Sequence, residues 1–198
     1  IICNAITPGL YSTNVILLNL LQNDILFFAG LAMMLFGLLK KLKIPGWGIL
    51  IISLVMSIFG TIFKGVDVGN PLGNCIIGWF IGTNIENIQF NTTSFFPLLN
   101  WFILVAAGYC YAWILKRVEK KGRFYIILGI ISAICIGLYI GICVNPGYGL
   151  FKEDFRVTYH IATYDALIGI CGSLFAFSLF YWLSFILPKF INYFGIIN

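Results

Sequence analysis

Long apolar runs separated by short polar stretches dominate the chain. Five runs approach or reach the roughly 20 residues that a helix needs to cross the apolar core of a bilayer. They cover residues 24–41, 47–63, 97–115, 124–144 and 164–187. Asn23 and Asp24 are predicted to cap the first run, and Pro188 is expected to end the last. The pattern predicts an all-α, polytopic transmembrane helical bundle of about five spans, and we treat residues 1–198 as a single integral membrane domain.

A sixth apolar segment, 71–82, is shorter than the others and has a different character. Gly73, Asn74 and Gly78 interrupt it. A brief, interrupted apolar segment fits a helix that re-enters the membrane or lies on its surface better than one that crosses it. We therefore expect a short re-entrant or interfacial helix here.

Composition agrees with a membrane protein and excludes a soluble domain. Hydrophobic residues make up 61% of the chain and charged residues only 10%, whereas soluble domains carry about 25% charged residues. The net charge of +5 does not indicate nucleic-acid binding, because the basic residues lie in short clusters between apolar runs. The six cysteines are scattered singly and there is one histidine, so we expect buried packing thiols and no metal site.

The distribution of charge predicts an orientation in the membrane. Loops on the cytoplasmic side are enriched in Lys and Arg. Nine of the basic residues fall in 40–46, in 116–123 and at Lys189, whereas six of the seven acidic residues fall in the alternate segments. We expect a multi-pass protein of the cell membrane with the first residues outside and the last in the cytoplasm.

Small residues recur every four positions in the fourth span, at Gly129, Ala133, Gly137 and Gly141. A helix face without large side chains lets a neighbouring helix approach closely. A milder version of this spacing in the second span comprises Ser53, Ser57 and Thr61. Both faces are predicted to be helix contacts.

Four residues at the predicted outer surface are candidates for binding a polar substrate. His160 is the only histidine and could act as a general base or could simply face water. Asp165 suits either a helix N-terminus or a binding site. Asn100 offers an amide, and Trp101 an aromatic surface that suits a sugar or a membrane anchor. We expect these four side chains to converge on one pocket, with no catalytic residue assigned.

The run from Phe95 to Trp101, with the sequence FFPLLNW, and the later Gly108 resemble the "FPLLPW…G" segment of bacterial membrane acyltransferases related to heparan-α-glucosaminide N-acetyltransferase and the acyltransferase-3 group. The stretches 159–167, 187–189 and 25–39 are similar to other parts of that family. The resemblance implies transfer of an acyl group from acyl-CoA, as co-substrate, to a sugar or glycan at the cell surface.

The chain departs from the family pattern in two places. Asn100 stands where the motif has its second proline, and no histidine precedes His160, although the family uses an essential histidine near its first spans. We expect the sequence to be a fragment, truncated at both ends, that is inactive by itself. A component of a small-solute transporter and a non-enzymatic assembly protein remain the alternatives.

Overall fold

The structure is a computed structural model that describes residues 24–69, 71–83, 96–144 and 161–193. Every regular element in this described part is a helix. The described residues form two compact units, and the divisions fall after Tyr111 in one helix and after Ala166 in another. Unit 1 contains the residues up to Tyr111 together with 161–166, and unit 2 contains the remainder.

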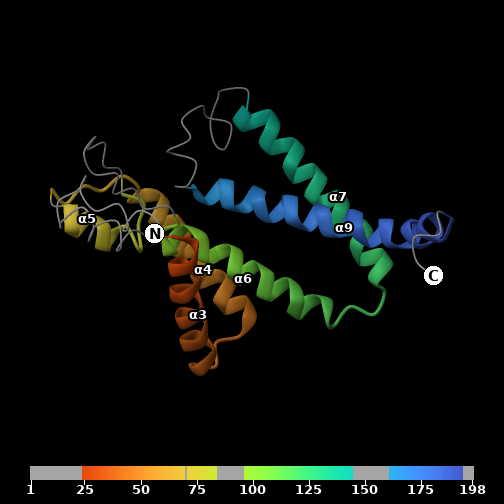
Figure 1. Cartoon of the computed structure of the whole chain (residues 1–198), viewed down its shortest axis with the longest axis horizontal. Coiled ribbons are helices and arrows are strands. Elements are labelled where there is room, and N and C mark those ends of the chain that lie inside the picture. Colours follow the sequence, from red (N-terminus) through yellow and green to blue (C-terminus); the bar gives the residue numbers. More distant parts are fainter. Residues whose placement is uncertain (1–23, 70, 84–95, 145–160, 194–198) are drawn as a thin grey trace, which may run out of the picture. The chain divides into compact units, whose positions relative to one another are not determined.

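The core of unit 1 forms where three apolar helices meet, α3 (Ile25–Lys41), α4 (Gly46–Ile62) and the first part of α6 (Leu98–Leu115) (Figure 1). As predicted, Asp24 caps α3, because its carboxylate accepts a hydrogen bond from the Ile25 amide at 2.6 Å. The buried side chains of this core come from all three helices: Ala32, Leu39, Ile49, Leu98, Phe102 and Ala106.

The turn between α3 and α4 is held by backbone hydrogen bonds. The amide of Lys43 donates to Lys40, and the amide of Ile44 donates to Leu39. These two hydrogen bonds together form the Schellman motif. The residue just after the end of the helix in this motif adopts a left-handed conformation and is usually glycine. Here that residue is Lys43, with a φ of 58°. A lysine thus occupies a position that favours a residue without a side chain.

The short helix α5 (Pro71–Ile77) has only seven residues, too few to cross a bilayer. The turn that follows it accepts hydrogen bonds at the start of α6, where the amides of Leu98 and Leu99 donate to the carbonyls of Trp79 and Phe80. The first amides of a helix have no partner within that helix. Segment 71–83 therefore completes the beginning of α6, and it contains no long helix.

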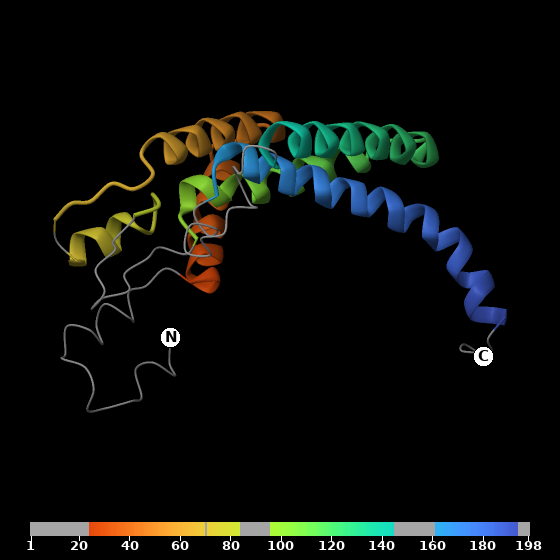
Figure 2. The same ribbon diagram turned by 90° about the horizontal axis from the view of Figure 1, so that it is seen from above.

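Unit 2 is built on α7 (Lys121–Tyr139), which continues as one π-helical turn, η1 (Ile140–Val144), and on most of α9 (Thr163–Tyr193). The expectation that Pro188 ends the last helix is wrong, because α9 continues to Tyr193. A proline inside a helix removes one hydrogen bond and commonly bends the helix without ending it. Figure 2 shows α9 curving towards its C-terminal end.

Within the described part of the chain, three helical segments are long and apolar enough to cross a membrane: Leu98–Leu115, Lys121–Ile142 and Thr163–Phe185. Gly46–Ile62 is apolar but shorter, and α3 likewise has 17 residues. The structure thus supports a helical membrane protein, while the predicted total of about five spans is not confirmed. The outward side of α7 fits a lipid environment, since its isoleucines at 126, 127, 130, 131 and 134 are all about half exposed.

The two predicted small-residue faces have different outcomes. On α4 the prediction is confirmed, because Ser53 and Ser57 are fully buried. On α7 it is confirmed only at Gly129, where an added Cβ would lie 3.3 Å from the Cβ of Ser178. A Cβ at Gly137 or Gly141 would meet nothing within 4 Å. The packed side of α7 is instead rotated towards Tyr125 and Ser132, which are buried.

Candidate functional site

The candidate site lies in unit 1, where the beginning of α9 meets α4 and the first turn of α6. Asn100 is the central residue. Pro97 precedes the helix and leaves Asn100 in its first turn, with only 2% of the side chain exposed. The Asn100 Nδ2 donates a hydrogen bond of 2.7 Å to the carbonyl of Ile161. This contact joins two segments that are 61 residues apart in the sequence.

The side-chain carbonyl oxygen of Asn100, Oδ1, lies against Gly60 of α4. A Cβ built on Gly60 would overlap the Oδ1 of Asn100 and would lie 2.8 Å from its Cγ. Within the described residues, Oδ1 has no hydrogen-bond partner. Gly60 is required here because a side chain would occupy the volume that Asn100 fills.

The hydroxyl groups of Ser57, Thr61 and Thr163 form a hydrogen-bond network close in sequence to Ile161, the residue that Asn100 contacts. The Thr163 amide donates to the Thr61 Oγ1 at 2.9 Å, and the two threonine hydroxyls are also 2.9 Å apart. The hydroxyl of Ser57 donates to Thr163 at 3.1 Å, and that of Thr61 donates to the Ser57 carbonyl at 2.9 Å. If Thr163 donates to Thr61, every hydroxyl in the network donates one hydrogen bond. The network therefore joins α4 and α9 without an ionised group.

Asp165 occupies the third position of α9, and it is 8% exposed. Its Oδ2 accepts a hydrogen bond of 3.1 Å from the amide of Ala162, the residue that precedes the helix. A third-position carboxylate that reaches back in this way forms one half of a capping box. The contact supports the helix-terminal role considered for Asp165, and it fixes the carboxylate beside residues 161 and 162.

The structure brings two of the four predicted site residues to one stretch of backbone. Asn100 binds the carbonyl of Ile161, and Asp165 binds the amide of Ala162. Trp101 is half-buried, and its ring makes an edge contact with Phe96 at a centroid distance of 4.9 Å. His160 lies outside the described residues, immediately before Ile161 in the chain. Convergence of all four on one pocket remains a prediction.

Sequence reasoning missed Gly60 and Thr163 as parts of this site. The spacing of Ser53, Ser57 and Thr61 did identify the correct face of α4, but only as a packing surface. Their hydroxyls could be assigned to a polar network only once the partner on α9 was known. Gly60 lies one residue from Thr61 and gave no separate signal.

A second polar cluster stabilises the loop between α4 and α5. The Oδ1 of Asp67 accepts hydrogen bonds from Asn74 Nδ2 at 2.7 Å and from the Gly69 amide at 2.8 Å. Asn74 in turn accepts from the Val68 amide at 2.8 Å. The hydrogen bond from Asn74, and then that from Gly69, lower the pKa of the Asp67 carboxyl below its usual value of 3.8.

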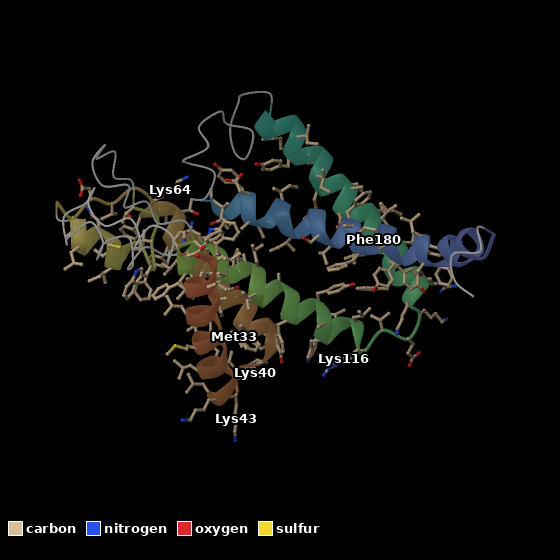
Figure 3. All side chains as sticks on the ribbon, in the orientation of Figure 1. Met33, Lys40, Lys43, Lys64, Lys116 and Phe180 are labelled. Atoms are coloured by element: carbon tan, nitrogen blue, oxygen red, sulfur yellow. The ribbon has the colours of Figure 1, made fainter. Side chains whose placement is uncertain are left out.

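The labelled lysines of unit 1 lie near the two opposite ends of α4. Figure 3 shows Lys40 and Lys43 at the end of α3 that leads into α4, and Lys64 at the opposite end of α4. The ammonium group of Lys40 donates to the hydroxyl of Tyr109 at 2.7 Å and lies 4.9 Å from the centre of its ring. One end of this unit thus presents a cluster of lysines, while Asp67 lies beyond the other end of α4.

The arrangement around Asn100 brings together amide, hydroxyl and carboxylate groups that are hydrogen-bonded within the protein. Among the residues that the structure describes, no group of three or more His, Cys, Asp or Glu side chains could hold a metal ion. Comparisons of the chain with protein-family models, with curated proteins and with solved structures find no match.

Proposed function

We infer that this chain is the membrane-embedded part of an acyltransferase that moves an acyl group from acyl-CoA to a sugar or glycan at the cell surface. The observation that carries the proposal is the hydrogen bond from Asn100 to the carbonyl of Ile161. It joins the two stretches, 95–101 and 159–167, in which the resemblance to membrane acyltransferases is concentrated. Segments that act on one substrate have to meet in space, and these two do.

The acceptor would bind beside the start of α9. A sugar hydroxyl needs a hydrogen-bond acceptor to orient it and a base to take its proton during acyl transfer. Asp165, held against the Ala162 amide at 3.1 Å, offers the first, and His160 is two residues before Ala162. Catalytic residues stay unassigned, because the family resemblance implies an essential histidine earlier than any in this sequence.

The acyl-CoA would approach from the opposite, cytoplasmic side. Its phosphates would be attracted to the basic segments 40–46 and 116–123. In this proposal the two segments are cytoplasmic and residues 151–160 are outside, as the distribution of Lys and Arg suggests. Labelling of single introduced cysteines from outside tests the orientation: a cysteine at Glu153 should react and one at Lys120 should not, and the reverse result would reject it.

Activity is tested with this chain and with a version extended upstream along its natural reading frame. Membranes containing each form are given acetyl-CoA with a labelled acetyl group, and label in glycan is counted. The extended form should transfer acetyl groups and the 198-residue chain should not. In the extended form, Asp165→Asn should reduce transfer by about 10²-fold if the carboxylate orients the acceptor, while Lys64→Gln serves as a control.

Two results would overturn parts of this proposal. Absence of transfer by the extended form, with donors of several acyl lengths, would reject the acyltransferase function. Robust turnover by the short chain that His160→Ala abolishes would instead make His160 catalytic.

The polar network between α4 and α9 also favours a second candidate, a small-solute transporter. Buried polar groups inside an apolar helical protein often form substrate or ion pathways, and Ser57 and Asp165 are both buried. Uptake of solute into vesicles containing the extended protein, without any consumption of acyl-CoA, would favour this alternative.

A further inference from the structure

The segment that joins α6 to α7 is short and strongly basic. Because α6 ends at Leu115 and α7 begins at Lys121, only residues 116–120 separate the two helices. Both helices are long and apolar enough to cross a bilayer. With these helices in a bilayer, a connection this short lies at the level of the lipid headgroups.

The positive charge of this segment, residues 116–123, which we call the basic loop, is not neutralised within unit 2. Its basic side chains are all exposed, and Figure 3 shows Lys116 where α6 ends. They are Lys116, Arg117, Lys120, Lys121 and Arg123. Among the described residues of unit 2, Glu119 is the only carboxylate. Five positive charges against one negative charge give the basic loop a net charge of +4, which attracts an anion from outside the unit.

Trp113 holds the side chain of Arg117 in place. The Cζ of Arg117 lies 3.7 Å from the centre of the Trp113 ring, and its Nη1 donates a hydrogen bond of 3.1 Å to the Trp113 carbonyl. A guanidinium group has five N–H donors, so this arrangement uses only part of them. The remaining donors of Arg117 can bind the oxygens of a phosphate, for which a guanidinium is well shaped.

Two partly exposed tryptophans from different helices flank the basic loop. Trp113, in the last turn of α6, is 41% exposed, and Trp182 of α9 is 42% exposed. The Trp182 ring reaches the first turn of α7, because a Cβ built on Gly122 would lie 3.8 Å from its Cη2. Tryptophan is enriched at the depth of lipid headgroups, where its ring meets apolar chains and its N–H meets polar groups. The basic loop thus combines positive charge with an aromatic surface.

We propose that the basic loop binds the headgroup of an anionic phospholipid. Arg117 and the neighbouring lysines hold the phosphate, and the two tryptophans contact the adjoining glycerol region. A headgroup such as that of phosphatidylglycerol has a net negative charge, whereas phosphatidylcholine adds a cation that the basic loop repels. This proposal goes beyond the acyltransferase function and does not depend on it, because lipid binding needs no acyl-CoA.

The test titrates the full 198-residue chain in detergent with phosphatidylglycerol or phosphatidylcholine and measures bound lipid by native mass spectrometry. The dissociation constant for phosphatidylglycerol should be at least about tenfold lower, since each basic residue beside an anionic headgroup contributes about fivefold in affinity. Equal dissociation constants for the two lipids would overturn the proposal.

A soluble competitor separates this site from a site for acyl-CoA. Coenzyme A carries the same phosphates as acyl-CoA but no acyl chain, and it should leave the phosphatidylglycerol bound. Displacement of the lipid by an equal concentration of coenzyme A would assign the basic loop to the donor of the proposed acyl transfer and overturn the lipid site. Absence of acyl transfer by the extended form, by contrast, would leave the lipid binding unchanged.

Matched pairs of exposed lysines test where the lipid binds. Lys120→Gln combined with Lys121→Gln should weaken binding of phosphatidylglycerol by at least about tenfold. Lys41→Gln combined with Lys43→Gln removes the same charge from the other basic segment, and binding should change by less than about threefold. Equal losses in the two double variants would show that affinity follows the net charge of the chain, which would overturn the proposal.

Glu119→Gln gives a test that does not depend on a loss of function. The substitution removes the only negative charge of the basic loop, so binding of phosphatidylglycerol should become about fivefold tighter. A variant that is merely misfolded would not bind more tightly. Unchanged or weaker binding by Glu119→Gln would overturn the proposal.

Discussion

The two units bury different kinds of side chain at their helix contacts. In unit 1, the contacts of α4 with α6 and with the start of α9 contain an amide and three hydroxyls, and a compact apolar core lies beside them. In unit 2, α7 and α9 meet through stacked tyrosines and through a glycine that lies against Ser178. The two helices of unit 2 are thus held together by close packing and aromatic stacking. The helices of unit 1 pack through apolar side chains and are also joined by hydrogen bonds between side chains and backbone.

This difference suggests where a polar substrate can bind. Burial of a hydrogen-bonding group in an apolar protein costs free energy unless the group is paired. Because the described polar groups cluster in unit 1, we expect a polar substrate to bind there. The segments 121–144 and 167–193 contain no carboxylate. We therefore expect substitutions in unit 1 to affect both stability and substrate binding, and those at the contact of α7 with α9 to affect stability alone.

The largest effect is expected for Gly60→Ala in unit 1. The new Cβ overlaps the Asn100 amide, which is held by Ile161 and cannot move freely. Overpacking of this kind costs about 1–3 kcal/mol, measured as the free energy of unfolding in mixed micelles. Gly108→Ala is the control, because a Cβ there meets nothing within 4 Å.

The double variant Gly60→Ala with Asn100→Ala sharpens this prediction. Removing the Asn100 side chain makes room for the Cβ, so the loss caused by Gly60→Ala should be smaller in that background. Equal losses in both backgrounds would show that Gly60 and Asn100 do not interact.

A smaller loss is expected in unit 2 for Tyr181→Leu. The substitution removes the stack on Tyr125 but keeps an apolar side chain, and aromatic pairs contribute about 0.5–1.5 kcal/mol beyond the area that they bury. The neighbouring Phe180 is 63% exposed, so Phe180→Leu should change the unfolding free energy little. A larger loss for Phe180→Leu than for Tyr181→Leu would contradict the assigned packing of α9.

A gain in stability is expected for Lys43→Gly at the α3–α4 turn. Lys43 has a φ of 58°, which glycine adopts without steric cost, whereas other residues lose about 1 kcal/mol there. The midpoint of thermal unfolding should rise. Lys41→Gly, one residue inside the helical end of α3, should lower it, and a lower midpoint for Lys43→Gly would argue against the Schellman turn.

The smallest effect is a dependence on pH in the loop of Asp67. Its folded pKa is lower than its unfolded pKa, so its contribution to stability is complete above the ordinary carboxyl value of 3.8 and is lost as the pH falls through the folded pKa. The protection of amides in residues 65–83, measured relative to the intrinsic exchange rate at each pH, should therefore decrease at low pH. In Asp67→Asn this protection should change little over the same range, and an identical decrease in that variant would exclude Asp67 as the cause.

The sequence predicted the helices well because their determinant is local. Apolar runs and end signals such as Asp24 define a helix without knowledge of its neighbours, and the boundaries of α3, α4 and α6 agree with prediction within one residue. The prediction that α9 ends at Pro188 was wrong because a proline inside a helix can be accommodated as a bend. The number of spans is less predictable, since 17-residue helices fall at the margin of bilayer thickness.

The candidate site was only half predictable, because its contacts join residues far apart in the chain. Asn100 and Asp165 were identified by their polarity and by equal predicted depth, and they do share one backbone stretch. The pairing of Thr61 with Thr163 and the space above Gly60 depend on how the helices rotate. Rotation also explains the small-residue face of α7, whose spacing was regular although only Gly129 reaches a neighbour.

The hydroxyl of Thr61 has a consequence for the order in which the protein is synthesised. Its partner Thr163 is 102 residues later in the chain, so α4 emerges from the ribosome long before that partner exists. In the meantime the Thr61 hydroxyl can donate to the Ser57 carbonyl within α4, at 2.9 Å in the finished structure, and threonine commonly satisfies itself in this way in apolar helices. When α9 arrives, the same oxygen accepts the Thr163 amide, so α4 can form early and still receive its late partner.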